Sequence, residues 1–358
     1  MFTRSNGTFI SPFNLVNIAL QMAAVGTIAV GVVFILLLGE IDLTVGIVSG
    51  LCAGVMAVLN VKMGVPGPVA VGAGIVTGTA IGLFQGMWIT QFRIPSFVVT
   101  LAGLIGWQGA LLYVLGSTGT INLRDPFITS LAGTFFTGWA AAAFGAAPVV
   151  YVVGTAYLRR RRRRAAGLGA ESLSALLIRS AVTAVLVAGA ILALTQDRGV
   201  PLSLVFFVGL IMVMDHVARR TRFGRMVFAV GGNREAARRA GIPVRAVRVA
   251  VFAIASTCAA WGGVLAASRL LAVNQSAGSG DVLLNAIAAA VIGGTSLFGG
   301  RGTVWAALLG ILVIQSISNG MDLLSLDSSV KFMITGAVLL VAVTIDAIAR
   351  RGRELAGA

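Results

Sequence analysis

The chain has 358 residues, of which 58% are hydrophobic and only 11% are charged, and its mean hydropathy is +0.97. A soluble protein of this length needs far more charge to cover its surface, so the composition excludes the soluble globular class. The net charge of +15 would indicate a nucleic-acid partner in a soluble protein. Here the arginines lie at the ends of apolar runs and are expected to mark one membrane face, so we predict no nucleic-acid partner.

Apolar runs of about 17–25 residues recur along the chain, and each is long enough to cross ~30 Å of hydrocarbon as a helix. The alternating segments of a membrane β-barrel are absent. We therefore predict an all-α polytopic membrane protein with about eleven spans, some of them short or re-entrant. The predicted spans cover residues 18–39, 44–60, 66–88, 96–115, 138–158, 175–195, 200–218, 249–268, 284–300, 303–319 and 330–348.

The arginines and lysines predict which side each loop faces. With residues 159–164, 219–248 and the C-terminal tail in the cytoplasm, 21 basic residues lie inside and 6 lie outside. This places a multi-pass protein in the bacterial inner membrane with a cytoplasmic C-terminus. It also puts residues 1–17 outside, which leaves three alternatives: a translocated N-terminus, a miscounted span, or a further helix that precedes this chain.

We predict a single transmembrane domain over residues 1–358. Its parts are a first half (12–158), an Arg-rich cytoplasmic loop (159–174), a pair of spans (175–218), a cytoplasmic loop (219–248), a second half (249–349) and a cytoplasmic tail (350–358). Both cysteines, Cys52 and Cys258, fall inside apolar segments without ligand spacing, so each is expected to be a small buried side chain.

Glycines repeat every four residues in two of the spans, and such smooth stripes let a neighbouring backbone approach closely. The stripes are Gly46, Gly50 and Gly54, and Gly74, Gly78, Gly82 and Gly86. We expect them to pack against other helices, with a sliding or gating surface as the alternative. Spans 44–60 and 284–300 are short and interrupted by glycine, a pattern typical of transport pathways.

Several polar residues in or near the spans are candidates for lining a substrate pathway. Glu40 and Asp42 lie beside apolar helices, where they either cap the next helix or face the pathway. The uncharged candidates can bind a polyol or another helix; they are Gln108, Asn285, Thr295 and Ser296. Three further polar residues lie near arginines at the predicted cytoplasmic ends of spans and are expected to be interfacial; they are Asp215, His216 and Asp346.

The sequence carries no motif for catalysis, and with one histidine it predicts no metal site. A phosphate-binding P-loop needs the sequence GK[ST], and both lysines, Lys62 and Lys331, follow valine. We therefore expect a pore or carrier that depends on a separate motor, or on none, and no cofactor on this chain.

The segment Thr221–Arg248 is the longest polar run between two spans, and residues 219–248 hold nine arginines and one acid, Glu235. Within it, Asn233 is a possible N-cap, Gly241 is expected to end a helix, and Pro243 prevents the helix from continuing. These signals predict a short helix over residues 234–240. A helix this short cannot form a core of its own, so it is expected to dock a partner; the alternative is a solvated linker.

The sequence GGNREAARRAGIPV (231–244) resembles the coupling loop in permease subunits of ABC sugar importers of the ribose/xylose type. Further segments resemble other motifs of that family in the same order, over about residues 10–350. They are GEIDLTVG (39–46), IPSFVVTLAG (94–103), LNAIAAAVIGGTSLFGGRGTV (284–304) and SNGMDLL (318–324). The family has an acid where this chain has Asn285, so the resemblance carries no carboxylate role to that residue.

The Arg-rich insertion between residues 135 and 198 resembles the xylose-type members, and the resemblance also places one more helix before residues 2–11. It implies D-xylose as cargo, an extracytoplasmic sugar-binding protein, a second permease copy, and separate ATPase subunits that bind ATP and Mg²⁺. The implied coupling residues are Gly232, Asn233, Glu235, Ala236, Ala237 and Gly241. The alternatives are another cargo such as ribose, or an ion-coupled secondary carrier, which needs ionisable residues deep in the membrane.

Overall fold

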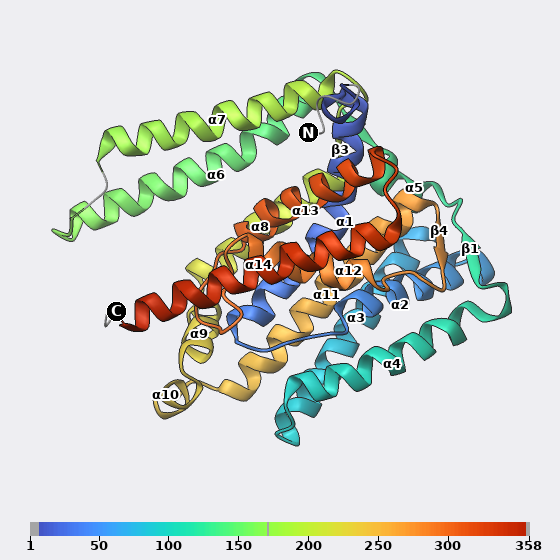
Figure 1. Cartoon of the computed structure of the whole chain (residues 1–358), viewed down its shortest axis with the longest axis horizontal. Coiled ribbons are helices and arrows are strands. Elements are labelled where there is room, and N and C mark those ends of the chain that lie inside the picture. Colours follow the sequence, from blue (N-terminus) through green and yellow to red (C-terminus); the bar gives the residue numbers. More distant parts are fainter. Residues whose placement is uncertain (1–6, 170–171, 356–358) are drawn as a thin grey trace.

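The computed structural model describes residues 7–169 and 172–355, and within these ranges it is built almost entirely from helices (Figure 1). Nine helices in the described ranges are long and apolar enough to cross a membrane, which confirms the all-α polytopic class. The helices are α1 (Pro12–Leu37), α2 (Val45–Ala57), α3 (Gly67–Gln91), α4 (Ser96–Leu115), α5 (Pro126–Gly133), α6 (Gly138–Ala165), α7 (Leu173–Thr195), α8 (Leu202–Arg220), α9 (Arg222–Gly232), α10 (Arg234–Arg239), α11 (Val244–Leu270), α12 (Asp281–Ile292), α13 (Trp305–Leu323) and α14 (Ser328–Leu355).

Short elements complete the chain. A π-helical turn, Val58–Lys62, extends α2, and 3₁₀ turns cover Thr8–Ile10 and Gly116–Thr118. Two antiparallel pairs join β1 (Thr120–Asn122) to β4 (Ala272–Asn274) and β2 (Phe135–Phe136) to β3 (Val200–Pro201).

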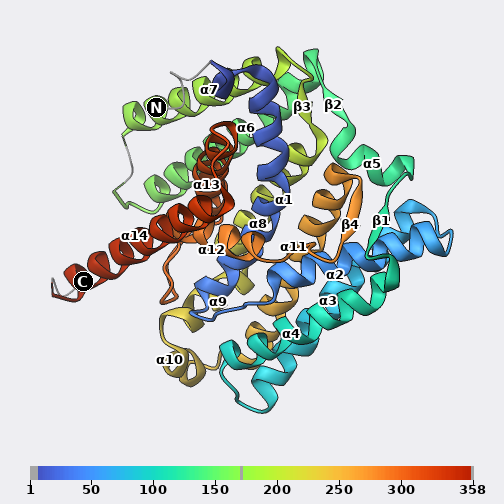
Figure 2. The same ribbon diagram turned by 45° about the vertical axis from the view of Figure 1, so that its right-hand side comes forward.

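Helix α1 lies at the centre of the bundle, and α11 packs against it and against α2 and α3 (Figure 2). Ser11 caps the start of α1 by accepting a hydrogen bond from the Asn14 backbone N–H at 3.3 Å, and Pro12 occupies the first turn, where its missing N–H costs nothing. In its most apolar 18-residue window α1 is 89% buried, whereas α7 is 6% buried. The two halves of the sequence therefore share one core.

The glycine stripe of α3 packs against α11 and α2, as the sequence predicts. A Cβ on Gly78 would lie 2.7 Å from the Ala260 Cβ atom and 2.8 Å from the Ser256 carbonyl oxygen. The stripe of α2 faces elsewhere: Gly46 and Gly50 lie against the loop that follows β4, at Gly278 and Ala277. In both places the missing side chain brings backbones into contact.

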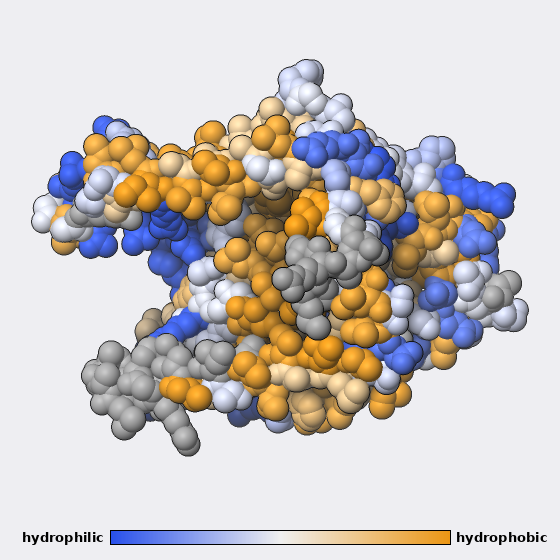
Figure 3. Space-filling view, turned by 45° about the horizontal axis from the view of Figure 1, so that its top comes forward, coloured by the Kyte–Doolittle hydropathy of each residue, from blue (hydrophilic) through white to orange (hydrophobic). Residues whose placement is uncertain are grey.

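Helices α6 and α7 form a hairpin that projects from the bundle (Figure 1), and its apolar side chains are largely exposed. Hydrophobic residues cover its outer face in Figure 3. At its base, Arg198 lies over the rings of Phe13, at 5.4 Å, and Phe135, at 4.9 Å, which ties the hairpin to the start of α1.

Two predicted boundaries were wrong. The span predicted over residues 284–300 is the 12-residue helix α12, because the chain turns at Gly293 and continues through glycines with positive φ, such as Gly299 and Gly300. The arginines at 159–164 lie within α6, and only the residues after Ala165 form the predicted loop. Arginine is a good helix former, so the helix continues past its apolar part. The predicted tail is helical to Leu355, and its last three residues lie outside the described range.

The close contact of α3 with α11 predicts that replacing glycine by alanine destabilises the protein at one position of α3 and not at another. Gly82→Ala would press a methyl group against the Phe252 carbonyl oxygen and the Ala253 Cα atom, so it should destabilise the protein by roughly 1–3 kcal/mol. Gly72→Ala, on the same helix with nothing within 4 Å, is the matched control and should be neutral or stabilising. Thermal unfolding in detergent measures both, and equal midpoints would contradict the packing.

Candidate functional site

Three segments that are far apart in the sequence meet at one end of the bundle. They are the connection between α1 and α2 (residues 38–44), the α9–α10 segment, and the loop between α12 and α13 (residues 293–304). The Gly300 N–H donates to the Leu37 carbonyl at 2.9 Å. A Cβ on Gly299 would lie 2.6 Å from the Gly231 carbonyl oxygen and 2.9 Å from the Gly39 N atom. We call this contact of backbones the glycine junction (residues 39, 231, 299 and 300).

Local sequence explains how α10 forms at this junction. The Asn233 side chain accepts a hydrogen bond from the Ala236 N–H at 2.9 Å and caps the helix. Gly241 has a φ of +79°, and its N–H donates to the Arg238 carbonyl at 3.0 Å, which ends the helix. Ala237 is 4% exposed and seats α10 on the bundle. The predicted helix over 234–240 is therefore confirmed to within one residue.

The Glu40 carboxylate joins α10 to the bundle electrostatically. Its Oε1 atom accepts from Arg234 Nη2 at 2.5 Å and from Arg248 Nη2 at 2.7 Å. The side chain of Glu40 is 5% exposed and that of Arg248 is 11% exposed, whereas that of Arg234 is 50% exposed. A buried carboxylate needs such partners, so this ion pair, which we call the Glu40 clamp, fixes the first residue of α10 against α11.

The outer face of α10 is solvent-exposed and charged. Glu235 forms ion pairs with Arg238 at 2.8 Å and Arg239 at 3.4 Å. The hydrogen bond from Arg238 lowers the pKa of Glu235, so this carboxylate is ionised at neutral pH. Ala236 and Gly241 are exposed beside it. The exposed face of α10 is thus small and carries both signs of charge, and the other side of the helix is held to the bundle by Ala237.

Two parts of this site were missed at the sequence level. Helix α9 was taken as part of the cytoplasmic loop over residues 219–248, although Thr221 caps it and Val227 and Val230 are buried on one face. The apolar spacing of Phe223, Val227 and Val230 is the signal that could have found it. The pairing of Glu40 with two arginines had no local signal, because the partners lie about 200 residues away.

Asp42 points into the bundle from the same connection as Glu40. Its Oδ1 atom accepts from the Thr44 N–H at 2.8 Å and from Thr44 Oγ1 at 2.6 Å, and Thr44 Oγ1 also lies 3.2 Å from Gln85 Oε1. Burial raises the pKa of Asp42, and the two hydrogen bonds from Thr44 act in the opposite direction. Asp42 and Gln85 are 4% and 1% exposed, so they form a polar network inside the helix bundle.

The other predicted pathway residues are not gathered into one site. Thr295 and Ser296 are buried in the loop that carries the glycine junction, where the Ser296 N–H donates to the Arg301 carbonyl at 3.1 Å. Gln108 lies on α4 and donates to the Gln275 carbonyl at 3.2 Å. Asn285 is half-buried on α12.

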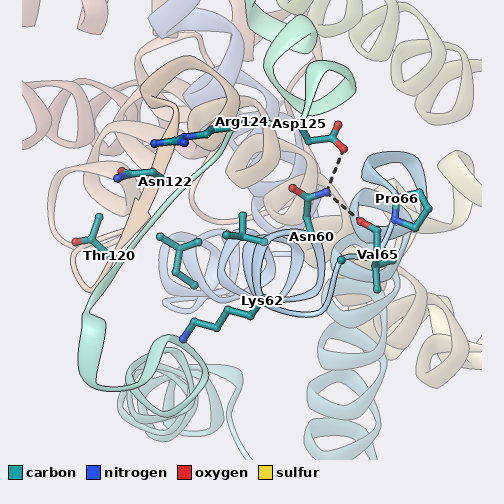
Figure 4. Close-up of a pocket in the computed structure, with 11 residues that line it drawn as sticks. Asn60, Lys62, Val65, Pro66, Thr120, Asn122, Arg124 and Asp125 are labelled. Atoms are coloured by element: carbon teal, nitrogen blue, oxygen red, sulfur yellow. Dashed lines mark hydrogen bonds between the residues drawn. The ribbon is translucent and has the colours of Figure 1, made fainter.

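A cavity of about 740 Å³ lies at the far end of α2 from the glycine junction, where the π-helical turn meets β1 (Figure 4). Asn60 lines this cavity, and its side-chain amide donates to the Val65 carbonyl at 3.0 Å and to Asp125 Oδ2 at 3.1 Å. Lys62 and Arg124 also line it. None of the pathway residues predicted from the sequence lines this cavity.

Comparison with known proteins identifies the family. Residues 14–343 match the family described as "Branched-chain amino acid transport system / permease component". The xylose transport system permease protein XylH of Escherichia coli (strain K12) is 38% identical, over 97% of this chain and 88% of its own length. XylH of Haemophilus influenzae is 35% identical (96% and 91%), and the ribose import permease protein RbsC of Bacillus subtilis (strain 168) is 30% identical (95% and 87%). No solved structure matched. The chain belongs to this permease family.

The Glu40 clamp predicts a strong dependence of stability on one carboxylate. Glu40→Gln leaves the buried Arg248 without an anion and should cost about 3 kcal/mol of folding free energy. Thermal unfolding in detergent measures this. Glu235→Gln is the matched control, because its ion pairs are fully exposed and its loss should leave the midpoint unchanged.

The double variant Glu40→Gln/Arg248→Met should recover much of the loss, since it removes the unpaired charge as well. A Glu40→Gln midpoint equal to that of Glu235→Gln would contradict the clamp.

Proposed function

Starting from this family membership, we propose that the chain is the membrane-spanning permease subunit of an ATP-binding-cassette importer whose cargo is D-xylose. The observation that carries the proposal is the 38% identity to a xylose transport system permease over 97% of the chain. The resemblance is not confined to one segment, since the family match covers residues 14–343. The cargo is the finer part of the proposal, because a ribose import permease is also similar.

We assign coupling to α10, which would dock a separate ATPase subunit that binds ATP and Mg²⁺. Its exposed Glu235 and Ala236 would contact that partner. Asn233, Ala237 and Gly241 would shape and seat the helix, and Gly232 would keep its backbone close to Gly300, whose Cβ position is 2.9 Å from the Gly232 Cα atom. Helix α10 is short and is held to the bundle by the Glu40 clamp and by the backbone contact at Gly300, which suits a part that must transmit movement.

Movement of α10 would reach the transmembrane helices through the Glu40 clamp. Glu40 belongs to the connection between α1 and α2, and Arg248 belongs to the first turns of α11. ATP binding favours one arrangement of a motor dimer, and a docked α10 would bias the permease between its two arrangements. We therefore assign Glu40 to coupling, and Asp42, Gln108, Asn285, Thr295 and Ser296 to the pathway.

The proposed orientation places the α10 end and the C-terminus in the cytoplasm of a bacterium, with the chain in the inner membrane. Arginines are abundant at the α10 end, which agrees with the positive-inside rule. The cavity at the other end of α2 would then face an extracytoplasmic sugar-binding protein. A second copy of the permease completes the assembly.

The decisive experiment for this function is reconstitution of the chain in proteoliposomes with the ATPase and the sugar-binding protein of the same importer. ATP-dependent uptake of D-xylose, competed weakly by ribose, is the expected result. Uptake of ribose in preference to D-xylose would overturn the cargo. Sugar uptake driven by an ion gradient without the ATPase would overturn the importer class.

Coupling through α10 predicts a selective loss of transport. Gly241→Val forces valine into a φ of +79° at the end of α10, where the site is open and no side chain is displaced. The expected result is fewer sugars imported per ATP hydrolysed in proteoliposomes, with membrane insertion unchanged. Gly167→Val is the matched control, since Gly167 also has a positive φ and open surroundings but lies after α6. An equal number of sugars imported per ATP in the two variants would contradict the assignment of coupling to α10.

A further inference from the structure

Helices α3 and α4 and the start of α2 bring together polar atoms that lack partners. Within the part of the chain that the structure describes, Asp42 Oδ2, Gln85 Nε2 and Trp107 Nε1 are buried and accept or donate no hydrogen bond. Asp42 is 4% exposed and Gln85 is 1% exposed. Buried polar groups in proteins nearly always have partners, so three in one place need an explanation.

Gly103 on α4 shows that two of these groups lie close together. The position that a Cβ would occupy on Gly103 is 2.8 Å from Gln85 Nε2 and 3.2 Å from Trp107 Nε1. The Thr44 Cγ2 atom is 2.9 Å from the same position. The two nitrogen atoms therefore lie near each other, beside a residue that has no side chain, where α4 faces α2 and α3 (Figure 2).

The arrangement of donors and acceptors is that of a site for hydroxyl groups. Gln85 Nε2 and Trp107 Nε1 can each donate to a hydroxyl oxygen, and Asp42 Oδ2 can accept from a hydroxyl. Thr44 Oγ1 links the carboxylate to the Gln85 amide, with contacts of 2.6 Å and 3.2 Å, and so fixes the orientation of both. A molecule with neighbouring hydroxyls satisfies donors and acceptor together.

Aromatic rings flank the same place. The ring of Trp107 meets Phe84 edge-on, with centroids 6.3 Å apart, and Phe84 lies 5.4 Å from Trp88. Trp107 and Gly103 are half-buried on α4, which is 17% buried in its most apolar window. Aromatic faces pack against the C–H face of a sugar ring, whereas a phosphate or another anion would gain little from them.

We propose that Asp42, Gln85 and Trp107 form a subsite that binds hydroxyl groups of the transported monosaccharide between α2, α3 and α4. The inference rests on the proposed sugar-importer function and names residues that would contact the sugar. Asp42 stands two residues after Glu40 in one connection, so a shift of α10 that moves the Glu40 clamp also moves a group of this subsite. Binding of sugar is thereby linked to the position of the ATPase-docking helix.

The test measures discrimination between hydroxyls rather than activity alone. Uptake of D-xylose and of its 2-deoxy, 3-deoxy and 4-deoxy analogues is measured in proteoliposomes for the wild type, Gln85→Leu and Trp107→Phe, always with the same sugar-binding protein and ATPase. The contribution of the binding protein cancels in the comparison of wild type with variant. Thr77→Val, on α3 with a hydrogen bond to the Ala73 carbonyl of its own helix, and Trp261→Phe, on α11 with its ring against Phe206, are the matched controls.

The expected result is that, for at least one hydroxyl, the preference for D-xylose over the deoxy analogue shrinks roughly threefold to tenfold in both variants, the effect of one lost hydrogen bond. The controls should keep the wild-type preference. Preferences within twofold of the wild type for all three analogues would overturn the subsite. If Gln85→Leu does not reach the membrane, the conservative Trp107→Phe variant decides. Failure of the wild type to import D-xylose would instead overturn the proposed function.

Discussion

One buried carboxylate holds together the end of the molecule that carries α10. The Glu40 carboxylate is buried, and the two guanidinium groups that pair with it come from α10 and α11. The same residue lies on the connection between the first two long helices of the chain. The Glu40 clamp therefore links four elements in one group of ion pairs: the central helix α1, the start of α2, the core helix α11 and the exposed helix α10.

The glycine junction adds close backbone packing beside that contact. Because Gly231, Gly299 and Gly39 have no side chains, three backbones approach directly and leave no flexible groups between them. The stripe of α3 gives the same close packing to α11 deeper in the bundle. By contrast, the α6–α7 hairpin is largely exposed. It meets the bundle at its base, where Arg198 lies over Phe13 and Phe135, and also along α6, where Tyr151 Oη donates to Asp215 Oδ2 at 3.1 Å. The molecule thus combines a closely packed centre with a largely exposed hairpin.

Local chemistry predicted much of this fold, since its signals lie within a few residues. Asn233 and Gly241 marked α10 to within one residue, and apolar length marked the long helices. The predicted helix boundaries were wrong where one local signal competed with another. Six arginines were taken as a loop although arginine favours helix, and the amphipathic spacing in α9 was overlooked within a polar run.

The candidate site was harder to predict, because its parts meet only in three dimensions. The motifs at residues 39–46, 231–244 and 284–304 were recognised separately, but nothing in their spacing shows that they share one junction. Glu40 and Asp42 looked alike in sequence, yet one faces arginines and the other a buried threonine and glutamine. Gln85 and Trp107 drew no attention, since single polar or aromatic residues in apolar helices are common.

The central claim is that α10 and the connection between α1 and α2 move as one body. Pulsed electron–electron double resonance measures the distance between spin labels at the exposed Ile41 and Ala240. The measurement is made in the complex with the ATPase, with and without trapped ATP. A reference pair joins Ala240 to the exposed Leu177 on the hairpin. The account predicts an unchanged Ile41–Ala240 distance and a changed Leu177–Ala240 distance. A nucleotide-dependent change between Ile41 and Ala240 would contradict it.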